Sequence, residues 1–207
     1  MDYARGNFSI VQDPTARQSP PLVGQATFPA GFSGGSEPIN LYVPIPEAKT
    51  LYVSWWMKLS PGFEGHPRSG VNKIFHIWIG GANRVTLSAQ GAGTSALQPQ
   101  VRLQRVAVPG GAVNLLPNAA PGATVVRGRW QHWELVLVAN GDGNADGSVE
   151  LWLDGVKVSD YCDQRFIAGT QDARWQSLNW APTWGGTGAS VRRPMYMWID
   201  HIYISGL

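Results

Sequence analysis

The feature that most constrains this chain is a succession of short segments rich in β-branched and aromatic residues, with almost no helical pattern between them. Clusters of Gly, Pro and Asn separate these segments, as is typical of turns between strands. Successive strands without helices favour an antiparallel sandwich or barrel, and 207 residues suit one all-β domain. The predicted strands span 51–59, 72–80, 84–89, 100–108, 130–139, 148–154, 156–161 and 194–205.

The stretch WQHWELVLVANGDGNADGSVELWLDGVKVSD, residues 130–160, predicts a three-stranded meander. Two alternating segments flank a loop at 140–147, so they are expected to pair as antiparallel strands. Asp154 and Gly155 then form a two-residue type I′ turn, because these residue types readily take positive φ.

The acidic loop inside this meander has two interpretations. Asp142, Asn144 and Asp146, followed by Gly147, have the alternating oxygen spacing that can converge on Ca²⁺. Position twelve of such a calcium loop falls on Leu153, where a bidentate Glu is required, and Asn, Asp and Gly also favour ordinary turns. The loop is therefore either a turn or a structural calcium site, and no other feature requires a cofactor.

Two segments are too long for hairpin turns and are predicted to be loops, at 109–128 and 162–193. The second carries Trp175, Trp180 and Trp184. These indoles either pin the loop by burial or, at Trp180 and Trp184, form an exposed rim on which sugar rings stack.

Composition narrows the possible partners. The net charge of +2 gives no electrostatic reason to expect nucleic acid, and no apolar run reaches the roughly 18 residues of a membrane span. The first residues carry no secretory signal pattern, although an extracellular or virion-surface location suits this class of domain. The lone Cys162 excludes an intramolecular disulfide.

Two stretches, GRWQHWELVLVANGDGNADGSVELWLDGVKV and MWIDHIYISG, resemble the concanavalin A-like lectin/glucanase superfamily. That superfamily includes laminin G-like domains, family 16 glucanases and several polysaccharide lyases. The resemblance implies a single jelly-roll domain over residues 1–207, with two stacked, curved antiparallel sheets, one of them concave.

The resemblance implies different catalytic groups for different members. The E-x-D-x-x-E motif of family 16 glucanases is absent, so retaining glycosidase chemistry is not expected. KIFHIW is similar to the Q-x-H strand of alginate lyase-like jelly rolls, with His76 at the His position, but Ile74 stands where Gln is required. The groups that could complete a lyase site are Arg102, Gln104 and a late tyrosine, Tyr196 or Tyr203.

Three functions remain open. The first is recognition of a polysaccharide on the concave sheet, by residues that strand alternation brings to one face: Tyr52, Trp56, His76, Trp78, Arg102 and Gln104. The alternatives are a polysaccharide lyase acting by β-elimination, and a structural or attachment domain, such as a virion decoration, bound to other protein subunits.

Overall fold

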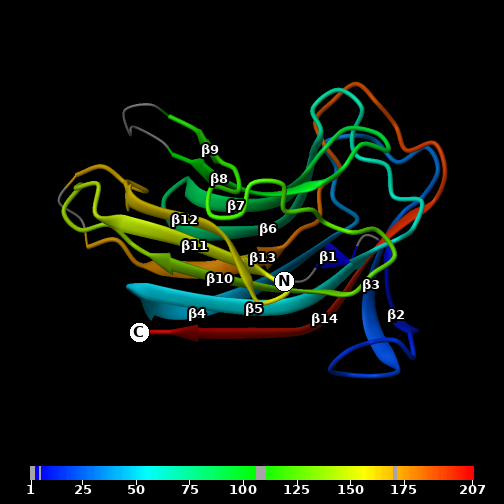
Figure 1. The fold of residues 1–207 in the computed structure, drawn as a ribbon, viewed down its shortest axis with the longest axis horizontal. Helices are drawn as coiled ribbons and strands as arrows, with labels where there is room; N and C mark the ends of the chain where they lie inside the picture. The colour runs from blue at the N-terminus through cyan, green and yellow to red at the C-terminus, as the bar shows by residue number, and fades with distance from the viewer. Residues whose placement is uncertain (1–2, 5, 106–110, 170–171) are drawn as a thin grey trace.

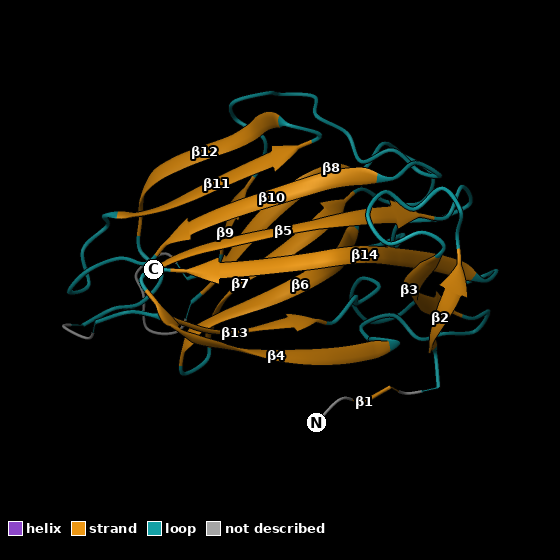
Figure 2. Cartoon of the chain, turned by 90° about the horizontal axis from the view of Figure 1, so that it is seen from below, coloured by secondary structure: helices purple, strands orange, loops and turns teal. Residues whose placement is uncertain are grey.

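The computed structural model describes residues 3–4, 6–105, 111–169 and 172–207. The described part consists of strands and loops without any helix, and hence without a helix able to cross a membrane (Figure 2). The strands are β1 (Tyr3–Ala4), β2 (Phe8–Gln12), β3 (Leu22–Phe28), β4 (Ile39–Ala48), β5 (Thr50–Leu59), β6 (Val71–Gly80), β7 (Asn83–Gln90), β8 (Gln98–Gln104), β9 (Val113–Leu115), β10 (Gln131–Val138), β11 (Gly147–Leu153), β12 (Val156–Gln164), β13 (Trp175–Trp180) and β14 (Met195–Gly206).

These strands form two antiparallel sheets stacked as a sandwich (Figure 1). The front sheet has the order β1-β4-β13-β6-β7-β8-β9, and the back sheet has the order β12-β11-β10-β5-β14-β3-β2. Hairpin-connected neighbours such as β6-β7-β8 alternate with pairs from distant parts of the chain, such as β4 with β13 and β5 with β14, as in a jelly roll. The predicted all-β sandwich is confirmed, whereas the prediction that the whole chain is one domain stays a prediction.

The 130–160 meander is confirmed. Strand β10 pairs with β11, and β11 pairs with β12, in the back sheet. Leu153 lies opposite Val156, which leaves a two-residue turn between them. In that turn Asp154 has φ 52° and Gly155 has φ 78°, the two positive values that a type I′ turn requires.

The two predicted long loops are wrong in part, because each contains a strand. Strand β13 lies within 162–193 and inserts between β4 and β6 in the front sheet. Strand β9 lies within 109–128 and pairs with β8 at the far edge of that sheet. The predicted strand end at 106–108 falls outside the described residues.

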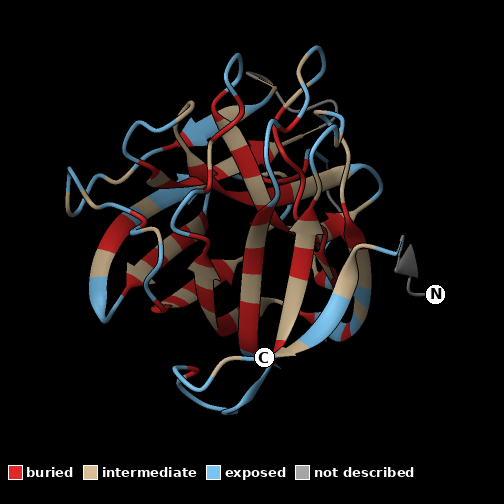
Figure 3. Cartoon of the chain, turned by 90° about the vertical axis from the view of Figure 1, so that its right-hand side faces the viewer, coloured by how far each residue is buried: buried red, intermediate tan, exposed pale blue. Residues whose placement is uncertain are grey.

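The core lies between the sheets and is built from the inward half of each alternating strand (Figure 3). Strand β10 shows the pattern most regularly, with every second residue buried. At the centre the rings of Trp55 and Trp133 stack 5.7 Å apart, and the Phe75 ring packs edge-on at 4.9 Å from that of Trp55. Burial of such side chains supplies about 25 cal/mol per Å² of apolar surface and holds the two sheets together.

Candidate active site

A cleft of about 220 Å³ lies on the exposed face of the front sheet. Its floor comes from β6, β7 and β8, and one wall comes from the segments around Ser69 and Gly185. The residues that line the cleft are Ser69, Val71, Lys73, Thr86, Ser88, Arg102, Gln104, Gly185 and Gly186. The lining combines hydroxyl, amide and cationic side chains, which suits a polar and anionic ligand.

A β-bulge in β6 places a lysine in this cleft. The register between β6 and β7 shifts between Lys73 and Phe75, so that Ile74 and Phe75 are both buried. Lys73 therefore shares the exposed face with His76, three positions later. Ile74, which occupies the Gln position of the Q-x-H-like stretch, is fully buried in the core, and Lys73 lies on the cleft side instead.

Cross-strand pairing aligns a row of polar residues around His76. Asn179 of β13 lies opposite His76 on one side, and Thr86 of β7 lies opposite it on the other. The row extends from Thr86 to Arg102 on β8 and from Asn179 to Tyr42 on β4. The front sheet thus brings groups from five strands to one face.

A chain of hydrogen bonds fixes how His76 and Gln104 are oriented. Arg84 can only donate, and its Nε lies 2.7 Å from Gln104 Oε1, which must therefore be the amide oxygen. Thr86 Oγ1 also donates to this oxygen at 2.7 Å, which uses its only proton. His76 Nδ1, 3.0 Å from Thr86 Oγ1, must then be the protonated ring nitrogen. As a result His76 Nε2 carries a lone pair, and the Gln104 amide group is left to donate.

Positive charge gathers in the cleft. Burial, reinforced by Arg84 and Lys73, lowers the pKa of His76 to about 3, so its ring is neutral at ordinary pH. Burial and the charges of Arg84 and Arg102 likewise lower the pKa of Lys73, with Glu37 acting in the opposite direction. These cations repel one another, and an anionic ligand would relieve that repulsion.

Trp78 is held on the same face as His76. Its indole Nε1 donates to Asn179 Oδ1 at 3.0 Å, and Asn179 Nδ2 donates to Asn40 Oδ1 at 2.8 Å. The guanidinium of Arg84 covers the ring, 4.8 Å from its centroid. On β8, Arg102 Nη1 donates to Asn114 Oδ1 at 2.9 Å. These contacts keep the predicted residues Trp78, Arg102 and Gln104 on the cleft face.

Other predicted site residues lie elsewhere. Tyr196 and Tyr203 belong to β14 in the back sheet, and their rings contact Trp198 and Tyr52 respectively. The prediction that one of these tyrosines joins His76 is wrong, because the core separates the two exposed faces. Tyr52 and Trp56 also lie on the back sheet, paired in register with β10, so they do not line this cleft either.

The predicted aromatic rim is also wrong. Trp180 and Trp184 are only 1% and 3% exposed, so neither ring face is available to a sugar. Trp180 packs edge-on against Phe8 in the core, and Trp184 Nε1 donates to the Glu64 carbonyl at 2.8 Å. The alternative, in which buried indoles pin this segment, is confirmed and includes the fully buried Trp175.

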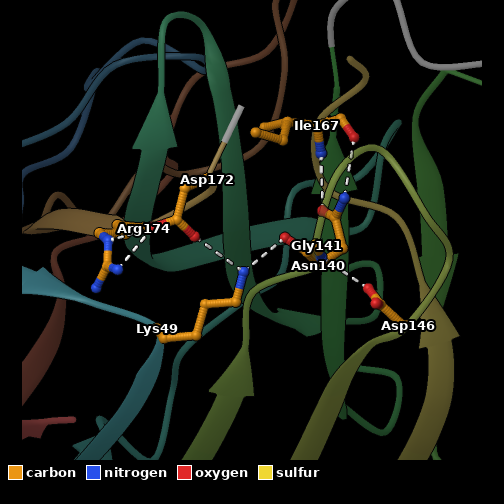
Figure 4. Close-up of polar contacts among 7 residues, drawn as sticks. All are labelled: Lys49, Asn140, Gly141, Asp146, Ile167, Asp172 and Arg174. Carbon is orange, nitrogen blue, oxygen red and sulfur yellow. Dashed lines mark hydrogen bonds and ion pairs between the residues drawn. The ribbon is translucent and has the colours of Figure 1, made fainter. Parts of the chain in front are cut away.

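The 140–147 loop is organised as a turn (Figure 4). Gly141 N donates to Asp146 Oδ1 at 2.7 Å, and Asn144 N donates to the Gly141 carbonyl at 2.7 Å. The turn is anchored to the next segment by Asn140, whose side chain bonds Ile167 through both its oxygen and its nitrogen. Within the described residues no three acidic, His or Cys side chains gather around a metal position. Calcium binding by Asp142, Asn144 and Asp146 stays a prediction.

Sequence reasoning missed several residues of this face, and Lys73 and Tyr42 are the two that carry acid-base groups. Lys73 is three positions from His76, a spacing that regular strand alternation assigns to the opposite face. Tyr42 lies opposite Asn179 in an overlooked strand and is 45% exposed. Its exposure places its ring on the outer face of the front sheet. The one sequence signal that could have indicated Lys73 is its position directly before Ile74 in the Q-x-H-like stretch.

No protein-family model and no curated protein matches the chain. Among solved structures, a mutant of the alginate lyase Aly36B in complex with alginate trisaccharide matches with a TM-score of 0.70 and 15% identity, over 98% of this chain and 88% of that chain. Endo-β-1,4-glucuronan lyase from the fungus Trichoderma reesei matches with a TM-score of 0.67 and 15% identity, over 100% and 90%. An alginate lyase from Aplysia kurodai matches with a TM-score of 0.70 and 11% identity, over 100% and 89%.

The chain thus has the jelly-roll fold that the resemblance in its sequence implied. More particularly, it has the form of this fold that these polysaccharide lyases share. At such low identity the likeness extends to the fold alone.

Proposed function

We propose that this chain is a polysaccharide lyase that cleaves a uronic-acid-containing glycan by β-elimination. The observation that carries the proposal is the bulge in β6, which sets Lys73 beside Arg102 and Gln104 in one cleft. The fold shared with alginate and glucuronan lyases supports it. Of the functions open from sequence, the lyase alternative is therefore preferred over simple recognition.

In this proposal Arg102 and the free amide group of Gln104 bind the uronate carboxylate. Neutralising that carboxylate acidifies the proton on C5, since the charge that develops after proton removal spreads onto the carboxylate. The Gln104 amide is already aligned, because Arg84 and Thr86 hold its oxygen. The two donors then need no reorganisation when the substrate arrives.

Lys73 is the proposed general base. Its lowered pKa leaves more free amine near neutral pH, and a base works best when its pKa is close to the working pH. The amine takes the C5 proton, the electron pair forms the C4–C5 double bond, and the bond from C4 to the glycosidic oxygen breaks. The leaving oxygen needs a proton, for which the Tyr42 hydroxyl is the proposed donor. His76, neutral and oriented by Thr86, accepts a hydrogen bond from a sugar hydroxyl.

A continuous ultraviolet assay for the unsaturated uronate product tests the proposal, on alginate, polyglucuronate and a heparin-like chain. Lys73→Met should lower kcat by about 10² to 10⁴-fold, the usual contribution of an acid-base group. Lys157→Met removes a lysine from the back sheet and should leave the rate unchanged. The wild-type rate should rise with pH as Lys73 loses its proton.

Two results would contradict this assignment. Absence of turnover on every uronate polymer, with binding intact, would return the chain to the carbohydrate-recognition function first expected from sequence. A rate that is independent of pH and lost only in His76→Ala would make His76 the base. An assembly or attachment role, and an extracellular or virion-surface location, stay predictions.

A further inference from the structure

A second hollow, of about 570 Å³, lies on the back sheet, on the opposite side of the sandwich from the cleft. Four separate segments converge on it: the β2–β3 connection, β5, the segment just before β10 and the β11–β12 turn. The residues that line the hollow are Thr15, Arg17, Trp56, Gly128, Arg129, Trp130 and Asp154. Two indoles and two guanidinium groups therefore meet on one surface.

We propose that this hollow is a second, non-catalytic binding site for an acidic polysaccharide. The choice of a uronate polymer as ligand rests on the proposed function. The partly exposed indole of Trp56 provides an apolar wall for the C–H groups of a sugar ring, and Trp130, which is only 7% exposed, backs that wall. Arg17 and Arg129 provide donors for a carboxylate, which guanidinium groups bind in a bidentate manner.

Arg17 is the free cation of this site. It is exposed, and within the described residues its guanidinium makes no hydrogen bond or ion pair. The guanidinium makes a cation–π contact with Trp56, whose ring centroid lies 5.6 Å from the guanidinium carbon. Asp154 is the acidic residue in the lining, and it already pairs with Arg129 and accepts a hydrogen bond from the backbone N–H of His132 at 2.9 Å. A carboxylate entering the hollow would thus meet an unpaired guanidinium.

The loop that carries Arg17 is anchored at both ends. Before it, Asp13 accepts hydrogen bonds from Thr15 N at 2.9 Å and from Trp130 Nε1 at 3.2 Å. It also pairs with Lys58, and both side chains are almost buried. After it, the Gln18 backbone N–H donates to Asp200 Oδ2 at 2.9 Å. Because the loop is held at both ends, binding requires little further ordering of its backbone.

The aromatic wall is equally well supported. Trp56 lies opposite His132 in the sheet, and their rings stack with centroids 4.9 Å apart. Lys58 sits against Trp130 at 5.0 Å and against Trp198 at 4.9 Å, measured from its ammonium to each ring centroid. These contacts keep the indoles in place without a ligand, so the site is preformed.

Affinity electrophoresis through gels containing alginate or polyglucuronate tests the second site. The background is Lys73→Met, so that turnover does not remove the ligand. In that background Arg17→Glu should weaken retardation by roughly fivefold or more, the usual effect of losing a charge-assisted contact. Arg192→Glu reverses an exposed charge in a loop outside this hollow and is the matched control.

Equal retardation of the Arg17→Glu and Arg192→Glu variants would overturn the proposal. So would an equal loss with the neutral polymer hydroxyethylcellulose, because charge recognition would then play no part. Trp56→Leu, checked for an unchanged circular dichroism spectrum, should weaken binding of both polymer classes if the indole is a wall of the site. Its unchanged binding would also overturn the proposal.

Kinetics separate this site from the proposed catalysis. With the Lys73 side chain restored, Arg17→Glu should keep wild-type kcat and KM on uronate trisaccharides, which are too short to reach both faces, while its KM for polymer rises. If the wild type turns over nothing but polymer retardation still depends on Arg17, the lyase function fails and the second site stands. If oligosaccharides and polymer both lose turnover in Arg17→Glu, the site is not independent and the inference fails.

Discussion

The lowered pKa of His76 links the charge of the front-sheet cleft to the free energy of unfolding. Its pKa of about 3 lies below its ordinary value of 6.5, so between these pH values the unfolded chain binds a proton that the folded chain does not. The free energy of unfolding must therefore fall as the pH drops from 6.5 toward 3. The cause is first burial and then repulsion by Arg84 and Lys73, the same features that make the cleft attractive to an anion.

We predict that His76→Asn flattens this pH dependence, since asparagine does not titrate. Urea unfolding at pH 7 and pH 4.5 measures it: wild type should lose more stability over this interval than the variant. The other titrating groups are shared by both proteins and cancel in the comparison. Equal losses would mean that the ring titrates normally in the folded state.

At the scale of a strand, the bulge in β6 predicts opposite outcomes for adjacent residues. Ile74→Gln restores the Q-x-H-like sequence but buries an amide at a fully buried position, so it should destabilise by about 2 to 4 kcal/mol. Lys73→Gln changes a residue on the cleft face and should cost less than about 1 kcal/mol while abolishing turnover. Chemical denaturation with the ultraviolet assay separates the two. A stable and active Ile74→Gln variant would contradict the bulge.

The same bulge explains what the sequence could and could not predict. Regular strands such as β10 and β11 were predicted closely because their alternation is unbroken. Strand β4 was missed because prolines, here Pro44 and Pro46, argue against a strand. Within the described residues strand β1 pairs only with Ile39 and Asn40, so the rest of β4 is an edge of the sheet, where proline is tolerated. A register shift has no local signature, so Lys73 could not be assigned to the cleft.

The loop between β10 and β11 carries the calcium prediction. If Asp142, Asn144 and Asp146 bind Ca²⁺, millimolar calcium should raise Tm in wild type relative to a chelator, and Asp146→Ala should remove that rise. Asp146→Ala should also lower Tm without calcium, because Asp146 accepts the Gly141 N–H. Calorimetry with and without calcium checks both effects. A wild-type Tm that calcium does not change would reduce the loop to a turn.

At the scale of the whole molecule, positive side chains gather at the two hollows although the net charge is only +2. The front cleft collects Lys73, Arg84 and Arg102, and the hollow on the back sheet collects Arg17 and Arg129. A long acidic chain can therefore interact with either face, whereas a neutral glycan gains nothing from these charges. The arrangement favours a polymeric anion over a small neutral sugar.

Salt should weaken binding of an acidic polymer more than it slows the chemical step. The Debye screening length falls from about 10 Å at 0.1 M salt to about 3 Å at 1 M. Attraction of a uronate polymer to the cationic hollows therefore weakens, whereas contacts inside the filled cleft change less. We predict that kcat/KM on the polymer falls roughly tenfold between low and high salt, mainly through KM. The control is a saturated reaction at each salt concentration, in which kcat should change much less. If kcat falls in parallel with kcat/KM, salt acts on the chemical step or on the fold itself, and the cations gathered at the two hollows do not govern capture of the substrate.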